Sequence, residues 1–151
     1  NIKEWDTKNW ICLANALAKE KVKVVLVGGK KEEKSVSDCG LSLKKNIDNF
    51  CGKTDIIESL SIIKNSDLVI GADTGMMHCA AALDKKTISL FGGTDFKVWR
   101  PYSKKNEVIV SNVACSPCYG LARGMECGER KCMNKIDVDY VIKKINEVIS
   151  I

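Results

Sequence analysis

Apolar residues recur along this chain with the period of an amphipathic helix in three separate segments. Segments 7–20, 55–67 and 137–149 place them at the i, i+3, i+4 and i+7 spacing that gathers them on one side of a helix. Asp55 and Glu58 also have the spacing of a capping box at the start of the second segment. We therefore predict three helices. Their apolar positions are Trp10, Leu13, Ala14 and Leu17, then Ile56, Ile57, Leu60 and Ile63, then Val138, Val141, Ile142, Ile145, Val148 and Ile149.

Short apolar runs rich in β-branched residues alternate with the helical segments and predict buried strands. Two of these runs end in a Gly-Gly pair, and another leads directly into a helix rich in small residues at 74–83. Segment 30–38, KKEEKSVSD, is predicted only to be a polar, solvated stretch. The predicted strands are 22–27, 46–54, 67–73, 86–93 and 107–112.

The alternation of strands and helices determines the expected fold class. Strands separated by helices form βα units, and such units favour a parallel sheet that helices cover on both faces. We therefore predict an α/β fold. The chain opens on a loop and a helix, whereas an α/β sheet usually opens with a strand, so residues 1–151 are expected to be a fragment of a longer protein.

Composition and charge narrow the class of protein. The chain has 151 residues, of which 45% are apolar and 28% charged, and this composition is typical of one soluble globular domain. Its net charge of +5 is spread along the chain, which favours solvated helix faces over a nucleic-acid-binding surface. The mild positive field still favours ligands that carry phosphate. The sequence contains no apolar run of the roughly 18 residues that span a bilayer and no signal peptide, so a cytosolic protein is expected.

Eight cysteines need an explanation in a cytosolic chain. Four of them lie singly within periodic apolar segments, where a thiol serves as a small hydrophobic group. The other four form the cluster Cys115-x2-Cys118-x8-Cys127-x4-Cys132. C-x2-C is a zinc spacing, but the eight-residue link is shorter than in the usual zinc ribbons. Free thiols, or a disulfide formed on isolation, are favoured in a reducing cytosol, and a structural zinc ion is the alternative.

An acid, a hydroxyl, a glycine and the only histidine gather directly after strand 67–73. Backbone N–H groups at a helix N-terminus attract anions, so Thr74 and Gly75 are candidates for binding a phosphate. Gly75 permits close approach to the backbone, and His78 lies one helical turn further on. The purely structural alternative is that Asp73 or Thr74 only caps the helix.

Two other predicted strands also end in glycines, at Gly28-Gly29 and Gly92-Gly93. Parallel strands bring their carboxyl ends to one edge of a sheet, where ligands of α/β proteins bind. Glu32, just after the first pair, could hold the hydroxyls of a ribose. A charged, solvated turn is the structural alternative for this segment.

Taken together, these motifs resemble a known family. IKEW followed by a helix, VVLVGGKKEE, the segment from FCGKTD to GADTGMMHCAAAL, ISLFGGTD and CSPC…CM are similar to the C-terminal half of glycosyltransferase family 9, the bacterial ADP-heptose:lipopolysaccharide heptosyltransferases. The resemblance covers nearly the whole chain. It implies a GT-B architecture of two Rossmann-like domains across a cleft, with residues 1–151 as the nucleotide-sugar-binding one.

The resemblance also implies roles for individual residues. Lys3 matches the lysine of a K-x-W motif that contacts the donor diphosphate and offsets the charge of the leaving group. Glu32 takes the position of the carboxylate on the ribose, and Thr54 the position where the backbone meets adenine. The residues implied to face the sugar and phosphates are Asp73, Thr74, Gly75 and His78.

For the whole reaction, the resemblance implies an inverting transfer of heptose from ADP-heptose to the lipopolysaccharide core. It implies no required cofactor or metal, an acceptor bound mainly by an N-terminal domain, and a cytoplasmic enzyme with peripheral contact at the inner membrane. The family's general base lies in that other domain, so this chain alone is expected to bind donor without transferring sugar. The alternatives are a sugar-nucleotide epimerase of the same layout and a non-enzymatic zinc or nucleic-acid module.

Overall fold

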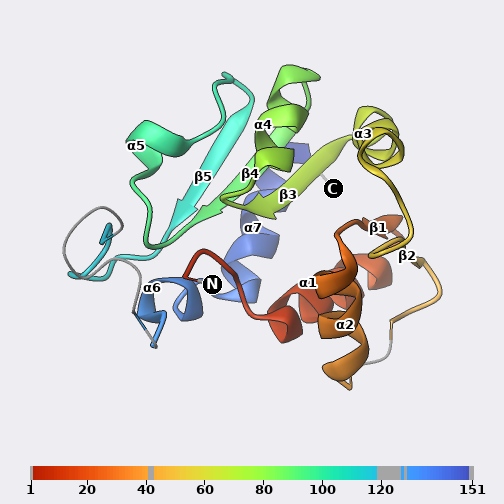
Figure 1. The fold of residues 1–151 in the computed structure, drawn as a ribbon, viewed down its shortest axis with the longest axis horizontal. Helices are drawn as coiled ribbons and strands as arrows, with labels where there is room; N and C mark the ends of the chain where they lie inside the picture. The colour runs from red at the N-terminus through yellow and green to blue at the C-terminus, as the bar shows by residue number, and fades with distance from the viewer. Residues whose placement is uncertain (1, 41–42, 119–126, 128, 150–151) are drawn as a thin grey trace. The chain divides into compact units, whose positions relative to one another are not determined.

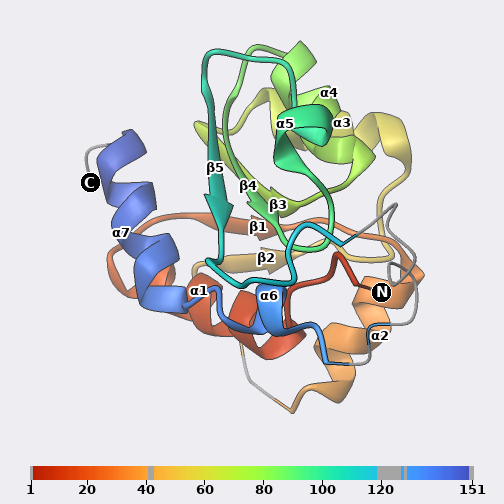
Figure 2. The ribbon, with the colours of Figure 1, turned by 90° about the vertical axis from the view of Figure 1, so that its left-hand side faces the viewer.

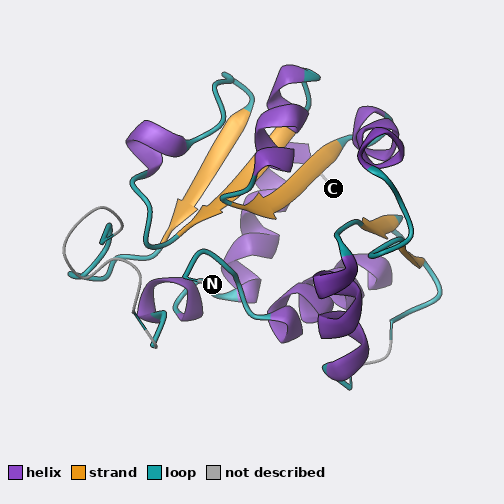
Figure 3. Ribbon diagram, viewed as in Figure 1, coloured by secondary structure: helices purple, strands orange, loops and turns teal. Residues whose placement is uncertain are grey.

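The computed structural model describes residues 2–40, 43–118, 127 and 129–149. Helices and parallel strands alternate along the chain, which confirms the predicted α/β class (Figures 1 and 3). Contacts divide the chain into two compact units, one of residues 6–61 and one of residues 1–5 with 62–151. Among the described residues, no helix combines the length and apolar character needed to cross a membrane.

The first unit is built on two short parallel strands, β1 (Val24–Leu26) and β2 (Ile47–Asn49). Helix α1 (Thr7–Lys19) buries Leu13, Ala14 and Leu17 as its apolar period predicts, while Trp10 is only half-buried. Ala14, Ala18 and Ile47 form a core cluster with partly buried side chains of β1. The predicted strand 22–27 is shorter than expected and only partly buried, because its sheet has just two strands.

Helix α2 (Lys30–Asp38) occupies the segment predicted to be only a polar stretch. It buries no residue, so the apolar period that identifies other helices is missing. Its lysines and glutamates are good helix formers, and the Glu32 carboxylate accepts a hydrogen bond from the Gly29 N–H at 2.9 Å. Helix propensity and this N-terminal hydrogen bond therefore form α2 without a buried face.

Helix α3 (Ile56–Lys64) begins with the predicted capping box. The Asp55 and Glu58 carboxylates each accept the other residue's backbone N–H, at 2.8 and 2.9 Å. The predicted apolar face is partly wrong, because Ile56 and Ile57 are 62% and 66% exposed. The helix instead buries the face with Ser59 and Ile63, which lie one turn apart.

The second unit contains three parallel strands in the order β3 (Leu68–Ala72), β4 (Lys86–Phe91), β5 (Asn106–Val110). Helices α4 (Gly75–Ala82) and α7 (Val138–Ile149) lie on opposite faces of this sheet, as the two views in Figures 1 and 2 show. The central strand β4 is buried along five of its six residues. This sheet therefore has the predicted arrangement of helices on both faces. The expectation of a single sheet was wrong, because the described strands form two separate sheets, β1–β2 and β3–β4–β5.

The helices of the second unit pack as their sequences require. Helix α7 buries Val141 and Ile145, which confirms its predicted apolar face. A Cβ atom on Gly71 would lie 2.5 Å from Met77 Sδ, so glycine allows α4 to approach β3. In this unit two further helices, besides α2 of the first unit, were not predicted, because four residues are too few to show a helical period. They are α5 (Phe96–Trp99) and α6 (Lys131–Asn134).

Candidate functional site

The carboxylate of Asp73 lies at the centre of a polar cluster at the carboxyl ends of β3 and β4. Asp73 follows β3, and its Oδ2 lies 2.9 Å from the Lys3 ammonium nitrogen. The Thr94 hydroxyl, which follows β4, donates to the same oxygen at 2.8 Å. The Asp73 side chain is only 8% exposed and that of Lys3 28%, so the ion pair is largely shielded from bulk water.

The segment Ile2–Trp5 places Lys3 beside Asp73. The Trp5 side chain is buried, and its indole N–H donates to the Ile136 carbonyl at 2.9 Å. A Cβ atom on Gly93 would lie 3.2 Å from the Ile2 side chain, so Ile2 packs closely against the backbone after β4. These contacts hold the IKEW segment at both ends and fix the direction of the lysine between them.

The N-terminus of α4 opens next to this ion pair. Thr74 is its extended N-cap residue, and its hydroxyl makes no capping hydrogen bond. Thr74, Gly75 and His78 are exposed, and a Cβ atom on Gly75 would meet nothing within 4 Å. First-turn amides of a helix generally lack partners within the helix, although in α4 the Met77 N–H donates to the Thr74 carbonyl at 3.1 Å. The structural alternative of a capping Asp73 is wrong, because its carboxylate binds Lys3 and Thr94 instead.

Glu32 and Thr54 belong to the other unit and are already engaged in local hydrogen bonds. Glu32 is exposed at the start of α2 and accepts the Gly29 N–H. The Thr54 and Ser59 hydroxyl oxygens lie 2.9 Å apart. The structure thus brings Lys3 and Asp73 to the N-terminus of α4, while the proposed ribose and adenine contacts form a second group.

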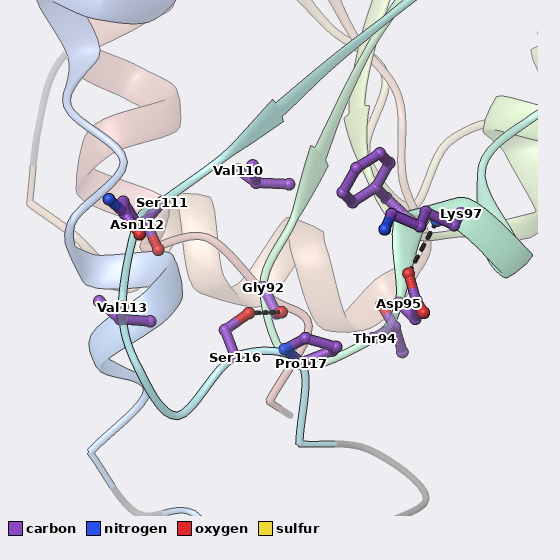
Figure 4. Close-up of a pocket in the computed structure, with 11 residues that line it drawn as sticks. Gly92, Thr94, Asp95, Lys97, Val110, Ser111, Asn112, Val113, Ser116 and Pro117 are labelled. Carbon is purple, nitrogen blue, oxygen red and sulfur yellow. Dashed lines mark hydrogen bonds between the residues drawn. The ribbon is translucent and has the colours of Figure 1, made fainter.

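A pocket of about 370 Å³ lies between the carboxyl ends of β4 and β5, with Thr94 in its wall (Figure 4). The Ser116 hydroxyl donates to the Gly92 carbonyl at 2.6 Å across its floor. The Ser111 hydroxyl oxygen, also in the lining, is buried and has no hydrogen-bond partner among the described residues. Thr94 was not among the predicted site residues, although it follows a glycine-ended strand, which indicates the same edge of the sheet.

The four clustered cysteines are free thiols, and two of them, Cys118 and Cys132, lie close to the backbone that follows β4. Cβ atoms on Gly92 and Gly93 would lie 2.9 Å from Cys132 Sγ and 3.5 Å from Cys118 Sγ. No three His, Cys, Asp or Glu side chains of the described residues are placed to hold a metal ion, so the zinc alternative gains no support. Among the single cysteines, Cys51 is buried as expected, whereas Cys12 is exposed.

Burial and the negative charge of neighbouring cysteine thiolates raise the pKa of two of these thiols, Cys118 and Cys132. Burial raises the pKa of the Cys118 thiol, and negative charge on Cys127 and Cys115 raises it further. Burial is also the main cause of the raised pKa of Cys132. A raised pKa lowers the thiolate fraction at a given pH, and the thiolate is the reactive form. Both thiols are therefore expected to react more slowly near neutral pH in the folded chain than an unperturbed cysteine would.

We expect iodoacetamide to alkylate Cys118 and Cys132 more slowly at pH 8 in the folded chain than in the same chain unfolded in urea. Site-resolved mass spectrometry over a pH series measures this directly. The folded-state rates should rise at a higher pH than the rates of the unfolded chain. Equal pH profiles in the two states would show that the fold does not shift these pKa values.

Comparison with known proteins matches this chain to one family along most of its length. A family model described as glycosyltransferase family 9 (heptosyltransferase) matches residues 1–128. Lipooligosaccharide heptosyltransferase 2 of Haemophilus influenzae is 28% identical over 153 residues, which cover 98% of this chain and 44% of that protein. Lipopolysaccharide heptosyltransferase 3 of Escherichia coli is 33% identical over 102 residues, 66% of this chain and 30% of that protein. The chain spans less than half the length of these relatives.

Solved structures share the fold. The E. coli ADP-heptose lps heptosyltransferase II superposes with a TM-score of 0.80 at 23% identity, covering 97% of this chain and 42% of that one. E. coli heptosyltransferase WaaC with ADP gives a TM-score of 0.77 at 21% identity, and the superposition covers 98% of this chain and 41% of that one. Neither set of matches favours an epimerase or a zinc or nucleic-acid module. With the family model matched over residues 1–128, the chain belongs to glycosyltransferase family 9.

Proposed function

We propose that residues 1–151 form the donor-binding domain of an inverting heptosyltransferase that uses ADP-heptose and a lipopolysaccharide core acceptor. The observation that carries this proposal is the Lys3–Asp73 ion pair beside the open N-terminus of α4. A cation next to first-turn amides suits a diphosphate, because both stabilise negative charge. The family membership and the solved relatives described with ADP support the choice of nucleotide.

The proposed chemistry concerns the leaving group. As the bond between sugar and diphosphate breaks, negative charge builds on the departing ADP, and the Lys3 ammonium offsets it. Asp73 and Thr94 act through Lys3 by holding the ammonium in place before the reaction begins. Thr74 and Gly75 supply phosphate donors, and His78 lies one turn along the same helix, toward the sugar and phosphates.

We assign the nucleoside to the first unit. Glu32 uses one carboxylate oxygen for the Gly29 N–H, and a carboxylate has a second oxygen that can accept from a ribose hydroxyl. Thr54 has its hydroxyl paired with Ser59, which leaves its backbone for the adenine contact. The expected selectivity for adenine therefore depends on main-chain groups near Thr54.

The remaining parts of the reaction are assigned outside this chain. We propose that a second domain binds the acceptor and supplies the general base that deprotonates its hydroxyl, since this chain matches less than half of its relatives' length. The reaction needs no metal or other cofactor in this scheme, because cationic and backbone groups stabilise the leaving group. The enzyme acts at the cytoplasmic face of the inner membrane.

Calorimetric titration with ADP, GDP and UDP tests donor binding by this chain. We expect saturable binding that is tightest for ADP and weaker in an Asp73→Asn variant, because the carboxylate no longer holds Lys3. Asp84→Asn is the matched control, since Asp84 forms an exposed ion pair with Lys105 beyond the opposite end of β4. Absence of nucleotide binding by the folded chain, or equal effects of the two substitutions, would contradict the proposal.

A further inference from the structure

A stretch of exposed aromatic, apolar and basic side chains follows β4 in the second unit. Within the segment FKVWRPYSKK, residues 96–105, Val98 is 69% exposed, Trp99 50% exposed and Tyr102 fully exposed. Basic side chains alternate with them, and these are exposed too. We call this surface the α5 patch, and it consists of Lys97, Val98, Trp99, Arg100, Tyr102 and Lys104.

The fold fixes the backbone beneath this patch. Asp95 caps α5, since its carboxylate accepts the Lys97 N–H at 2.9 Å. The Arg100 N–H donates to the Phe96 carbonyl at 3.0 Å. Pro101, which lies between Trp99 and Tyr102 in the sequence, has a fully buried side chain, whereas those two aromatic side chains are exposed. The exposed aromatic side chains therefore project from an anchored segment.

The charge of the patch has one sign. In the part of the chain that the structure describes, no acidic side chain forms an ion pair with Lys97, Arg100 or Lys104. The neighbouring Lys105 differs, because it pairs with Asp84. Asp95 directly precedes the patch in sequence, and its carboxylate is engaged at the N-terminus of α5, where it accepts the Lys97 N–H. The patch thus presents three cations together with Val98, Trp99 and Tyr102.

We propose that the α5 patch docks on the surface of an anionic phospholipid bilayer. Tryptophan and tyrosine favour the boundary between headgroups and acyl chains, where an apolar ring and a polar group are both accommodated. Lysine and arginine are attracted to the negative surface potential of anionic lipids. Nucleic acid could form ion pairs with the three cations, but it provides no apolar environment for the Val98 side chain. A bilayer accommodates all six side chains of the patch.

The choice of a bilayer over a protein partner rests on the proposed function, whose acceptor is a lipopolysaccharide. One patch residue, Lys97, also lines the pocket that has Thr94 in its wall. The other five patch residues neither line that pocket nor belong to the Lys3–Asp73–Thr94 cluster. Substitutions of these five should therefore leave ADP binding intact. This separation allows membrane docking and donor binding to fail independently of each other.

The test is co-sedimentation of the chain with vesicles of phosphatidylethanolamine, with and without phosphatidylglycerol. We expect binding only when phosphatidylglycerol is present. The double variant Arg100→Gln/Lys104→Gln, which leaves the pocket lining unchanged, should lower the partition coefficient by about 30-fold, since each cation near such a surface contributes about fivefold. Trp99→Ser/Tyr102→Ser should also lose binding, and a blue shift of tryptophan emission on vesicles should be missing in Trp99→Phe.

Matched controls separate the patch from general electrostatics. Lys135→Gln/Lys143→Gln removes the same net charge from exposed lysines elsewhere in this unit, and Tyr140→Ser removes a tyrosine that is 45% exposed on α7. Both controls should bind vesicles nearly as the unmodified chain does. The proposal is overturned if the unmodified chain does not bind anionic vesicles, or if the patch and control variants lose vesicle affinity equally. It is also overturned if the patch variants change only the self-association of the chain and not its vesicle binding.

Discussion

Lys3→Ala is expected to weaken ADP binding by about 10- to 100-fold, because hydrogen bonds to charged groups contribute about 1.5–3 kcal/mol. The substitution removes the cation that we propose faces the donor diphosphate. It also leaves the Asp73 carboxylate, which is only 8% exposed, with an uncompensated negative charge close to the proposed phosphate site. Titration calorimetry with ADP gives the change in dissociation constant directly.

The control for this substitution is Lys105→Ala. Lys105 also forms an ion pair with an aspartate in the same unit, but its side chain is 48% exposed and that of Asp84 78%. An exposed pair of this kind contributes little to stability, so folding and ADP binding should both be nearly unchanged. If Lys3→Ala binds ADP as tightly as Lys105→Ala does, Lys3 does not contact the donor diphosphate.

Trp5→Ala is expected to lower the free energy of unfolding by about 3–5 kcal/mol, the range for truncating a buried aromatic side chain. Trp5 is 2% exposed, and its indole N–H satisfies the Ile136 carbonyl. The loss frees the segment that holds Lys3, so ADP binding should weaken at the same time. Urea unfolding followed by circular dichroism measures the change in stability.

Two further variants assign this effect to burial and to the hydrogen bond. Trp5→Phe keeps most of the apolar volume but leaves the Ile136 carbonyl without its donor, and should cost about 1–3 kcal/mol. Trp99→Ala truncates a tryptophan that is half-exposed on α5, and should change stability by less than about 1 kcal/mol. Equal losses from Trp5→Ala and Trp99→Ala would mean that Trp5 does not anchor the IKEW segment.

The candidate site could be predicted from sequence only in part. Thr74 and Gly75 follow a β-strand and begin a helix, and this local pattern is sufficient to indicate an anion site at a helix N-terminus. Thr94 also follows a glycine-ended strand, but its hydrogen bond to Asp73, 21 positions earlier in the chain, cannot be inferred from the local sequence. The resemblance to the family indicated Lys3, whereas its pairing with Asp73 became visible only in the structure.

The sequence alone determined the features that depend on neighbours within a few residues. The α/β alternation, the Asp55–Glu58 capping box and the buried face of α7 all follow from local periods and spacings. It failed where the local signal was missing, as in the polar α2, or misleading, as at the exposed Ile56 and Ile57.

Only the tertiary structure decided which distant groups meet. The indole of Trp5 and the carbonyl of Ile136 are 131 residues apart, yet their hydrogen bond helps to set the position of Lys3. The parallel pairing of β3 with β4 brings Asp73 and Thr94 to one edge of the sheet. Such contacts depend on how the elements pack, because burial and register are properties of the whole sheet and of the segments against it.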